Sequence, residues 1–474
     1  MAVDLISETI SLAQQDPDRD SVIEVDGGTW SRGRILRAAC GIAETLDTQL
    51  SQDAVVMVHG PGGGGFWSAM LAVLGTGRRV LPVNQDLPAR DREAIAKAQG
   101  VSGVIETDSD GSKAQLPNIL SIDVEHTMST CVGSLNRGQE ASLLLRSSGT
   151  TGQPAVALRN AHALDAVTKT LIDTIGFHSE DRVFAALPMH HAYGIEHAVL
   201  APMRSGACVV WKSGFDLSGP VERHLREATL FPAVPFTLEA ATRMDGSQSS
   251  MRLAYTAGTT LPHAVRIEFE SGWGVPVGDL YGATELGTIT WGTGGVVHPV
   301  AGVSVRIRDE AGRISNTGKG ELLVKSNAMF DGYLATYAGT PNTDRCVDGY
   351  LQTGDVGTVH PDGQVEITGR LKSQFDVGGL KVNPEEIEDA LMGHSGVAEV
   401  AVVPLALTST VTRVRAVIVV HAGWEDRIHE SLQSFTLEHL APHQRPRVFD
   451  IQKTLPRTAS GKLLRYQLID DSSS

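Results

Sequence analysis

Short apolar runs that favour β-strands alternate with helical patterns over the first part of the chain. Strand-like runs occupy residues 54–58, 80–83, 103–106, 183–187 and 208–211. A helical pattern over residues 67–74 follows the first of these runs. Alternation of this kind is typical of parallel strands joined by crossover helices. The pattern therefore predicts an α/β fold built on parallel sheets.

The pattern of predicted secondary structure changes near Gly294. From there, glycine turns separate closely spaced strand-like segments at residues 303–308, 320–325, 349–357 and 363–368. After Gly369 and Arg370, the chain returns to a mixture of helical patterns and strand-like runs. Because 474 residues are too many for one hydrophobic core, we predict two domains. They are a large N-terminal domain, residues 1–369, with a small β subdomain at about 294–369, and a small α+β C-terminal domain, residues 370–474.

Charge and cysteine content exclude several classes of protein. The formal net charge of −15 leaves no basic surface for a nucleic acid. The cysteines lack the CxxC spacing of zinc sites and form no evident disulfide framework. They are Cys40, Cys131, Cys208 and Cys346. The N-terminus is acidic where a signal peptide is basic, and no 18 apolar residues run together. We predict a cytoplasmic protein without a membrane span.

A hydroxyl- and glycine-rich string, RSSGTTGQP at residues 146–154, follows the strand-like run at 143–145. Glycines allow backbone N–H groups to converge on an anion, and the hydroxyls add further donors. The string therefore predicts a loop that holds the phosphates of a nucleotide. A solvated surface turn is the alternative that this string alone leaves open.

Seven strings in a fixed order carry a resemblance to a known family. They are SSGTTGQP at 147–154, LPMHHAYG at 187–194, YGATE at 281–285, DGYLQTGD at 348–355, GRLK at 369–372, VNPEEIE at 382–388 and LPRTASGK at 455–462. Together they cover nearly the whole chain. The sequence resembles the adenylate-forming, AMP-binding superfamily of acyl-CoA synthetases, carrier-loading adenylation domains and luciferases, and is closest in pattern to a carboxylate–CoA ligase. The resemblance implies that ATP and an acid form an acyl-adenylate with release of pyrophosphate, and that a thiol then displaces AMP.

The resemblance also implies which residues bind ATP. The loop would wrap the β- and γ-phosphates through Ser147, Ser148, Gly149, Thr150, Thr151 and Gly152. In YGATE, Tyr281 would cover the adenine ring by stacking, Thr284 would donate to the α-phosphate, and Glu285 would bind Mg²⁺. Gly282 would belong to the same nucleotide-binding set. A surface carboxylate at the start of a helix is the ordinary alternative for Glu285.

Asp355 and Arg370 complete the nucleotide residues that the resemblance implies. Asp355 would accept hydrogen bonds from both ribose hydroxyls, because a carboxylate offers two oxygens to a vicinal diol, and Arg370 would assist it. The string TGD alone is more often a plain turn.

Four further residues imply, by the same resemblance, a mobile small domain. Lys462 resembles the lysine that bridges the substrate carboxylate and the α-phosphate during adenylation. Lys372 matches the hinge, and rotation there would bring Gly378 and Gly379 to the site for thioester formation. A solvated lysine and a tight glycine turn are the ordinary alternatives for these residues.

The acid would be held by residues from two other strings. The resemblance implies that His191 closes the acyl pocket as a gate. The pocket would be lined by Tyr193, Gly194, Thr256, Ala257 and Gly258. A tyrosine at 193, where amino-acid-activating relatives carry an aspartate, argues against an α-amino acid as substrate. We reject a zinc site at His190 and His191, since neighbours on a strand point to opposite faces.

Other catalytic classes are disfavoured. The string HGPGGGG at residues 59–65 superficially resembles a dinucleotide loop, but it has no suitable acidic anchor, and Pro61 removes one N–H donor. We interpret it as structural. A serine hydrolase is disfavoured because no GxSxG string is present.

The sequence also departs from the family pattern. Ala155 and Val156 stand where most relatives have lysine and glycine, so one phosphate-contacting cation is missing.

We predict ATP-dependent activation of an acyl or aryl acid of specialised metabolism and its transfer to coenzyme A. One alternative keeps this chemistry with a carrier-protein thiol or an amine as acceptor, including activation of nitrite for diazotisation. A second is a catalytically degenerate nucleotide-binding protein. The sequence identifies neither the acid nor the oligomeric state.

Overall fold

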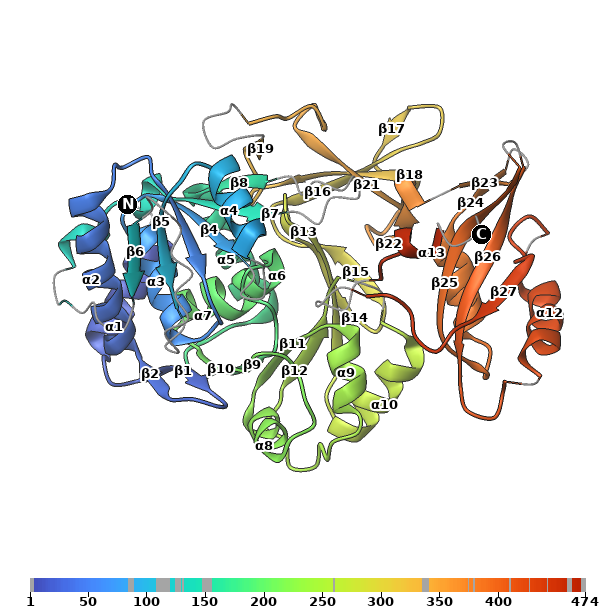
Figure 1. Cartoon of the computed structure of the whole chain (residues 1–474), viewed down its shortest axis with the longest axis horizontal. Helices are drawn as coiled ribbons and strands as arrows, with labels where there is room; N and C mark the ends of the chain where they lie inside the picture. The colour runs from blue at the N-terminus through green and yellow to red at the C-terminus, as the bar shows by residue number, and fades with distance from the viewer. Residues whose placement is uncertain are drawn as a thin grey trace. The chain divides into compact units, whose positions relative to one another are not determined.

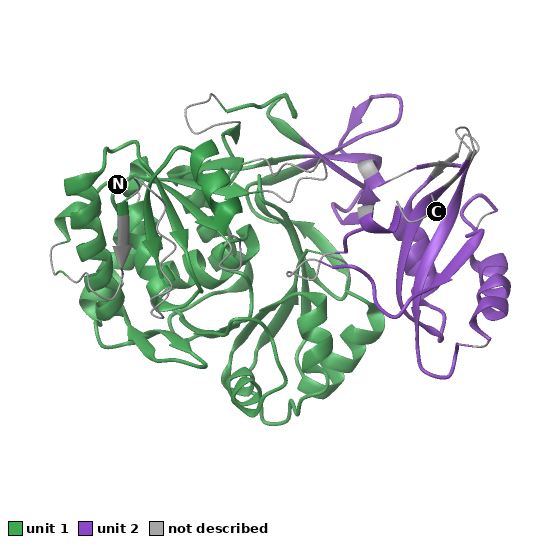
Figure 2. Ribbon diagram, viewed as in Figure 1, with its two compact units in different colours: residues 1–304, 324–351 green, residues 305–323, 352–474 purple. Residues whose placement is uncertain are grey.

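The computed structural model divides the chain into two compact units (Figure 2). Unit 1 comprises Met1–Ser304 and Val324–Leu351, and unit 2 comprises Val305–Leu323 and Gln352–Ser474. The predicted boundary at residue 370 stays a prediction. The structure describes residues 4–83, 89–107, 120–123, 129, 132–146, 156–258, 261–334, 341–373, 375–377, 380–408, 411–425, 427–440, 442–457 and 463–469.

A nine-stranded sheet forms one half of unit 1 (Figure 1). Its order is β15-β14-β13-β12-β11-β9-β10-β1-β2, and neighbouring strands from β13 to β1 are parallel. The apolar runs of the sequence form the buried central strands, as parallel strands covered on both faces require. The strands are β1 (Asp20–Glu24), β2 (Thr29–Ser31), β9 (Arg182–Ala185), β10 (Cys208–Trp211), β11 (Leu230–Ala233), β12 (Leu253–Thr256), β13 (Val277–Ala283), β14 (Gly287–Thr293) and β15 (Val296–Pro299).

A seven-stranded sheet forms the other half of unit 1, in the order β19-β8-β7-β4-β3-β5-β6. Its strands are parallel except for β8, which runs antiparallel to both β7 and β19. The predicted phosphate loop thus connects two paired strands, and Arg146 lies opposite Val156 in their register. The strands are β3 (Val55–His59), β4 (Arg79–Val83), β5 (Val101–Glu106), β6 (Leu120–Asp123), β7 (Ser142–Arg146), β8 (Val156–Asn160) and β19 (Gly332–Leu334).

Helices cover both sheets of unit 1. The largest core contains residues of α1, α2, α3, α5 and α7 together with residues of both sheets. A second core joins α8, α9 and α10 to the nine-stranded sheet, and α4 packs in a third. The helices are α1 (Leu5–Gln15), α2 (Arg32–Gln49), α3 (Gly64–Gly75), α4 (Ala89–Ala98), α5 (Ala161–Ile175), α6 (Ala192–Ile195), the π-helical turn η3 (Glu196–Leu200), α7 (Ala201–Ser205), α8 (Gly219–Glu227), α9 (Pro235–Ala241) and α10 (His263–Trp273).

The glycine string at 59–65 leads into α3 and supplies its first two residues, and every residue of this helix is buried. A Cβ atom on Gly64 would lie 2.0 Å from the Trp30 ring, and one on Gly62 would lie 2.4 Å from Trp211. Close packing alone therefore accounts for these glycines, in agreement with the structural interpretation.

Glycine-separated strands form a further sheet in the order β17-β16-β18-β21-β20, with β22 paired to β21. The predicted segments of the β subdomain therefore exist as strands. Three of these strands, β16, β18 and β21, run through a boundary between the units. The strands are β16 (Val303–Arg308), β17 (Ile314–Ser315), β18 (Gly318–Ser326), β20 (Cys346–Val347), β21 (Tyr350–Val359) and β22 (Val365–Arg370).

The rest of unit 2 is an α+β structure around its own core. The antiparallel pair β25 and β26 is extended by the parallel strand β27, and α11 and α12 supply core residues. The elements are the 3-10 turn η4 (Leu371–Ser373), the paired strands β23 (Phe375–Val377) and β24 (Leu380–Val382), α11 (Pro384–Met392), β25 (Val397–Thr408), β26 (Val411–Val420), α12 (Ile428–His439), β27 (Val448–Ile451) and α13 (Tyr466–Ile469).

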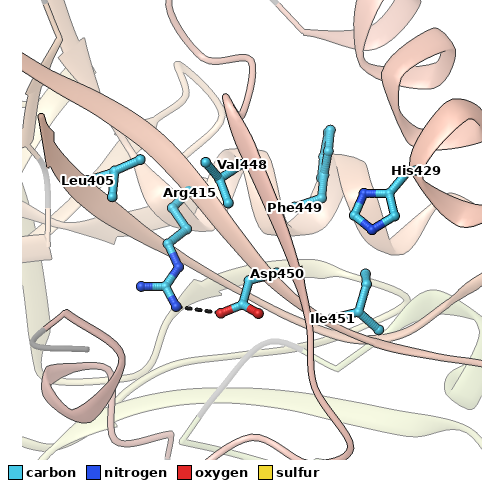
Figure 3. Close-up of a pocket in the computed structure, with 7 residues that line it drawn as sticks. All are labelled: Leu405, Arg415, His429, Val448, Phe449, Asp450 and Ile451. Carbon is cyan, nitrogen blue, oxygen red and sulfur yellow. Dashed lines mark hydrogen bonds and ion pairs between the residues drawn. The ribbon is translucent and has the colours of Figure 1, made fainter. Parts of the chain in front are cut away.

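An open surface cavity of about 370 Å³ lies on β25–β27 (Figure 3). The ion pair between Arg415 and Asp450 crosses it, and Arg415 Nη1 also donates to the Leu468 carbonyl at 3.3 Å. None of the predicted site residues lines this cavity.

No helix within the described residue ranges is both long enough and apolar enough to span a bilayer.

Candidate nucleotide and acid site

Two predicted motifs lie at the same edge of the nine-stranded sheet. Parallel strands end at a common edge, and β12 and β13 are parallel neighbours, with Thr256 opposite Asp279. Thr256 is the last residue of β12 and is followed by Ala257 and Gly258, and the YGATE string spans the end of β13 and the turn after it. Ligands in α/β proteins bind outside the carboxyl ends of such strands. The structure therefore brings the predicted acid residues and the predicted Mg²⁺ ligand to adjacent strand ends.

Glu285 lies in the turn between β13 and β14, not at the start of a helix as its ordinary interpretation supposed. The turn closes through a hydrogen bond of 3.0 Å from the Leu286 N–H to the Ala283 carbonyl. The Glu285 carbonyl accepts from the Phe330 N–H at 2.8 Å. This half-buried carboxylate is thus held by its backbone at a strand end.

Tyr333 of β19 is a site residue that sequence reasoning missed. Its hydroxyl donates to Glu285 Oε1 at 2.5 Å, and its ring packs edge-on against Phe330. Burial and the neighbouring Glu285 charge raise the pKa of Tyr333, so the phenol keeps its proton as a donor. The local sequence around Gly332 and Tyr333 does not indicate that the tyrosine hydroxyl contacts Glu285.

Backbone irregularity shapes the YGATE segment. The β13–β14 register shifts between Tyr281 and Gly282, which marks a bulge, and bulges are common beside active sites. A Cβ atom on Gly282 would lie 2.8 Å from the Gly287 carbonyl oxygen, so close approach requires glycine there. Tyr281 and Thr284 are half-buried. Their roles toward adenine and the α-phosphate stay predictions.

The predicted phosphate-loop residues Ser147, Ser148, Gly149, Thr150, Thr151 and Gly152 lie outside the described residues. Their flanks are described: Arg146 ends β7 and Val156 begins β8. Burial lowers the pKa of the Arg146 guanidinium, while the charge of Asp91 opposes that effect. The loop thus begins beside a half-buried cation that the sequence analysis did not single out.

The predicted acid side is an aromatic cluster with few exposed polar atoms. The Tyr193 hydroxyl donates to the Ala233 carbonyl at 3.1 Å, and its ring lies 4.6 Å from that of His197. His197 Nδ1 lies 2.9 Å from the Tyr255 hydroxyl. In the described part of the chain, neither His197 Nε2 nor Thr256 Oγ1 has a hydrogen-bond partner.

Burial fixes the protonation of this cluster. It lowers the pKa of His197 to about 3 and raises the pKa values of Tyr193 and Tyr255. All three side chains are therefore neutral at pH 7. Of the other predicted pocket residues, Ala257 is buried and Gly258 is exposed with φ +93°.

His190 and His191 lie in a turn after β9, with ring centroids 4.3 Å apart. The two histidines are therefore not neighbours on a strand, and the prediction that their side chains point to opposite faces is wrong. Burial, followed by the charges of His191 and Arg146, lowers the pKa of His190 to about 3. Among the residues that the structure describes, no three His, Cys, Asp or Glu side chains gather as metal ligands. The gate role of His191 stays a prediction.

Gly194 permits α6 to pack against the preceding turn. A Cβ atom at this position would lie 2.1 Å from the Pro188 carbonyl oxygen. Packing alone therefore explains why this position is glycine. The role of Gly194 in lining the acyl pocket stays a prediction.

A buried ion pair joins β8 to η3, and the sequence analysis missed it. Arg159 Nη1 donates to Glu196 Oε1, and the two side chains are 0% and 5% exposed. Burial raises the pKa of Glu196 and the Arg159 charge opposes that rise. The only sequence signal was an arginine within an apolar strand. This pair ties the strand after the phosphate loop to the helical segment that follows Tyr193.

Asp355 and Arg370, predicted to bind the ribose, are cross-strand partners in unit 2. They lie opposite each other in the β21–β22 register, and Arg370 Nε is 2.8 Å from Asp355 Oδ1. The Asp355 N–H donates to Thr353 Oγ1 at 3.0 Å. The Asp355 carboxylate is 6% exposed, whereas the Arg370 side chain is 53% exposed.

The remaining predicted residues lie partly or wholly outside the described residues. The backbone of Lys372 lies in η4, and Gly378, Gly379 and Lys462 are outside the described ranges. The described residues on either side of 458–462 pair with each other in unit 2, since Arg457 forms an antiparallel bridge with Leu463.

Charged side chains secure the same two flanks. Arg457 pairs with Glu399 at 2.5 Å, and Arg465 pairs with the nearly buried Glu388 of α11. Burial raises the pKa of Glu388 to about 7.

Comparison with protein families matches both parts of the chain. The model described as AMP-binding enzyme matches residues 11–334, and the model described as AMP-binding enzyme C-terminal domain matches residues 386–462. The chain is 31% identical over 415 residues to a 4-hydroxybenzoate–CoA/benzoate–CoA ligase of Rhodopseudomonas palustris, across 82% of this chain and 75% of the relative. It is 30% identical over 372 residues to a malonate–CoA ligase of Arabidopsis thaliana, across 69% of this chain and 60% of the relative.

Solved structures share the fold. ATP-bound MatB from Rhodopseudomonas palustris matches with a TM-score of 0.89 at 23% identity, over 99% of this chain and 98% of that one. O-succinylbenzoate CoA synthetase (MenE) from Bacillus subtilis, bound to its acyl-adenylate intermediate, matches with a TM-score of 0.83 at 24% identity, over 98% of each chain. The predicted α/β fold class and the prediction of an AMP-binding ligase are confirmed. The chain belongs to the AMP-binding enzyme family.

Proposed function

We propose that the protein is an ATP-dependent carboxylate–CoA ligase. The observation that carries this proposal is the arrangement at the carboxyl edge of the nine-stranded sheet. Glu285, a fixed carboxylate, directly follows β13, and Tyr255 of the neutral aromatic cluster lies in the parallel neighbour β12. Such an edge can hold a nucleotide and an uncharged acyl group side by side. The names of the relatives, which are CoA ligases for benzoates and for malonate, agree with this reaction class.

The first step joins two anions, so it needs cations and fixed donors around the α-phosphate. Thr284 and Lys462 would contact the reacting phosphate and carboxylate, and Asp355 with Arg370 would hold the ribose. Glu285 fits a Mg²⁺ ligand, since it is a hard oxygen donor in a half-buried turn. Mg²⁺ usually needs only one or two protein carboxylates, because nucleotide phosphates and water complete its shell. The bound ion would neutralise the charge of the leaving pyrophosphate.

The acid side favours an aryl or other largely apolar acid. His197, Tyr193 and Tyr255 are neutral, and their rings pack together. Position 193 carries a tyrosine and not a carboxylate, so it offers no negative charge to the α-amino group of an amino acid. This agrees with the sequence-based expectation that the substrate is not an α-amino acid. The unpartnered Nε2 of His197 and Oγ1 of Thr256 could recognise one polar substituent on the ring or chain.

The acceptor is proposed to be coenzyme A, with a carrier-protein thiol or an amine as the alternatives. The same adenylate would serve each of them, because they differ only in the nucleophile of the second step. A cytoplasmic location accompanies the proposal, since ATP and coenzyme A are both cytoplasmic substrates.

ATP–pyrophosphate exchange tests the first step. Wild-type protein is assayed with Mg²⁺ and a panel of benzoates, cinnamates and short aliphatic acids, and Lys462→Ala serves as the inactive comparison. We expect exchange with at least one aryl acid and a loss of about 100-fold or more in Lys462→Ala. Absence of exchange across the panel, with ATP still bound, would instead support the degenerate nucleotide-binding alternative. Mass spectrometry of products with coenzyme A, amines and nitrite then identifies the acceptor.

A further inference from the structure

A short turn that carries Arg345 is pinned beside the candidate Mg²⁺ ligand. Asn342 and Tyr333 exchange two backbone hydrogen bonds, of 2.8 and 3.0 Å. The turn then closes through the Cys346 N–H, which donates to the Thr343 carbonyl at 2.7 Å. The backbone on either side of Arg345 is therefore fixed relative to β19, although its side chain is exposed.

Gly332 makes this close approach possible. Its φ is +141°, a conformation that residues with side chains rarely adopt, and a Cβ atom there would lie 2.8 Å from both the Asn342 carbonyl oxygen and Pro341 Cβ. Any larger residue would push the Arg345 turn away from Tyr333. Gly332 thus allows the turn that carries Arg345 to pack against β19, the strand whose Tyr333 contacts Glu285.

The side chains continue this connection. Arg345 Nη1 donates to the Tyr333 hydroxyl at 3.1 Å, and that hydroxyl donates to Glu285 Oε1 at 2.5 Å. The guanidinium therefore lies two hydrogen bonds from the candidate Mg²⁺ ligand. A cation at that distance from Glu285 is close to where the β- and γ-phosphates would accompany Mg²⁺.

Strand register places this network beside the strand that follows the phosphate loop. In the antiparallel β19–β8 pair, Tyr333 lies opposite Ala157 and Leu334 lies opposite Val156. Position 155, where the loop has alanine in place of the lysine of most relatives, immediately precedes this paired segment. The network of Arg345 and Tyr333 therefore lies at the end of β8 that directly follows position 155 in the chain.

We propose that Arg345 binds the β- and γ-phosphates of ATP and the pyrophosphate product, and so replaces the charge that the loop lacks at Ala155. The inference rests on the proposed function. The exposed guanidinium can turn from the Tyr333 hydroxyl to phosphate oxygens, and its planar fork suits two oxygens at once. Arg345 is then a nucleotide-binding residue, and Tyr333 is a positioning residue that holds it beside Glu285.

Titration of MgATP and of Mg-pyrophosphate by calorimetry, without acid, tests the proposal directly. For Arg345→Ala we expect both dissociation constants to rise about 10- to 100-fold, since a charge-assisted phosphate contact is lost. Arg345→Lys should recover part of the loss. The matched control is Arg243→Ala, which removes an exposed arginine elsewhere in unit 1 and should leave both constants unchanged.

A rescue separates replacement of charge from a structural role. Ala155→Lys added to Arg345→Ala should restore nucleotide binding to within a few-fold of wild type, because the lysine returns a cation to the loop. Unchanged binding in Arg345→Ala, or no rescue by Ala155→Lys, would overturn the proposal. Calorimetry is independent of catalysis: wild-type protein that binds MgATP but shows no exchange would refute the proposed function and leave this test intact.

Discussion

The acid side and the nucleotide side of unit 1 differ in electrostatic character, although Tyr255 of the first lies in β12 and Glu285 of the second directly follows its parallel neighbour β13. On the acid side, burial keeps His197, Tyr193 and Tyr255 neutral. On the nucleotide side, the half-buried Glu285 and the exposed Arg345 are joined through the Tyr333 hydroxyl. A dry aromatic region suits an apolar acid, whereas an accessible charged region suits phosphates and a metal ion. The contrast predicts that substitutions on the two sides affect different measurements.

The largest effect is expected on the nucleotide side. Glu285→Gln removes the proposed metal-binding charge, so ATP–pyrophosphate exchange should fall by roughly 1,000-fold, which corresponds to several kcal/mol of transition-state stabilisation. The apparent Mg²⁺ requirement should rise as well. Glu268→Gln, an exposed carboxylate on α10, is the matched control and should retain full activity. An exchange rate within tenfold of wild type would contradict the assignment of Glu285.

The next effect is on stability. Arg159→Met or Glu196→Gln each leaves a buried partner uncompensated, so each should lower the free energy of unfolding by roughly 3–5 kcal/mol in urea titrations. The double variant Arg159→Met/Glu196→Leu should recover much of this loss, because no charge is then buried. Single variants as stable as wild type would contradict the interpretation that Arg159 and Glu196 form a buried ion pair that stabilises the fold. Michaelis constants for ATP should not change in the folded fraction.

The smallest effect is a dependence of stability on pH. His197 has its pKa lowered from 6.5 to about 3, so the folded protein excludes a proton that the unfolded chain binds below pH 6.5. The free energy of unfolding is therefore unaffected by this group above pH 6.5, and it decreases progressively as the pH falls from 6.5 toward 3.

Substitution at His197 isolates this contribution. Between pH 7.5 and 5.5, wild type should lose about 1.4 kcal/mol more than His197→Gln. His263→Gln, at an exposed position on α10, should follow wild type. Parallel curves for wild type and His197→Gln would show that the acid side is open to protons.

Much of the fold follows from local sequence patterns. The apolar runs at 54–58, 80–83 and 208–211 form β3, β4 and β10 with shifts of at most one residue, because buried parallel strands need continuous apolar side chains. The helix expected over 67–74 is α3, which extends somewhat further at its N-terminal end. The YGATE string was also readable locally, since it combines a strand end with a polar turn.

The contacts that organise the site were not readable. Glu285 and Tyr333 are 48 residues apart, and Arg159 and Glu196 are 37 residues apart. Each pair forms only because separate strands and helices meet in the folded unit, and neither member carries a local signal for its partner. The turn of His190 and His191 was missed for a related reason, since an apolar run of strand-like residues does not show where its pairing stops.

The chain enters unit 2 twice and leaves it once in between, since that unit is assembled from Val305–Leu323 and Gln352–Ser474. For protein engineering, this means that no single splice point exchanges one compact unit for that of a relative. A junction after residue 370 would separate β22 from η4 and would leave 305–323 and 352–370 on the fragment that carries unit 1. Recombination that keeps both units whole requires crossovers after 304, 323 and 351 together.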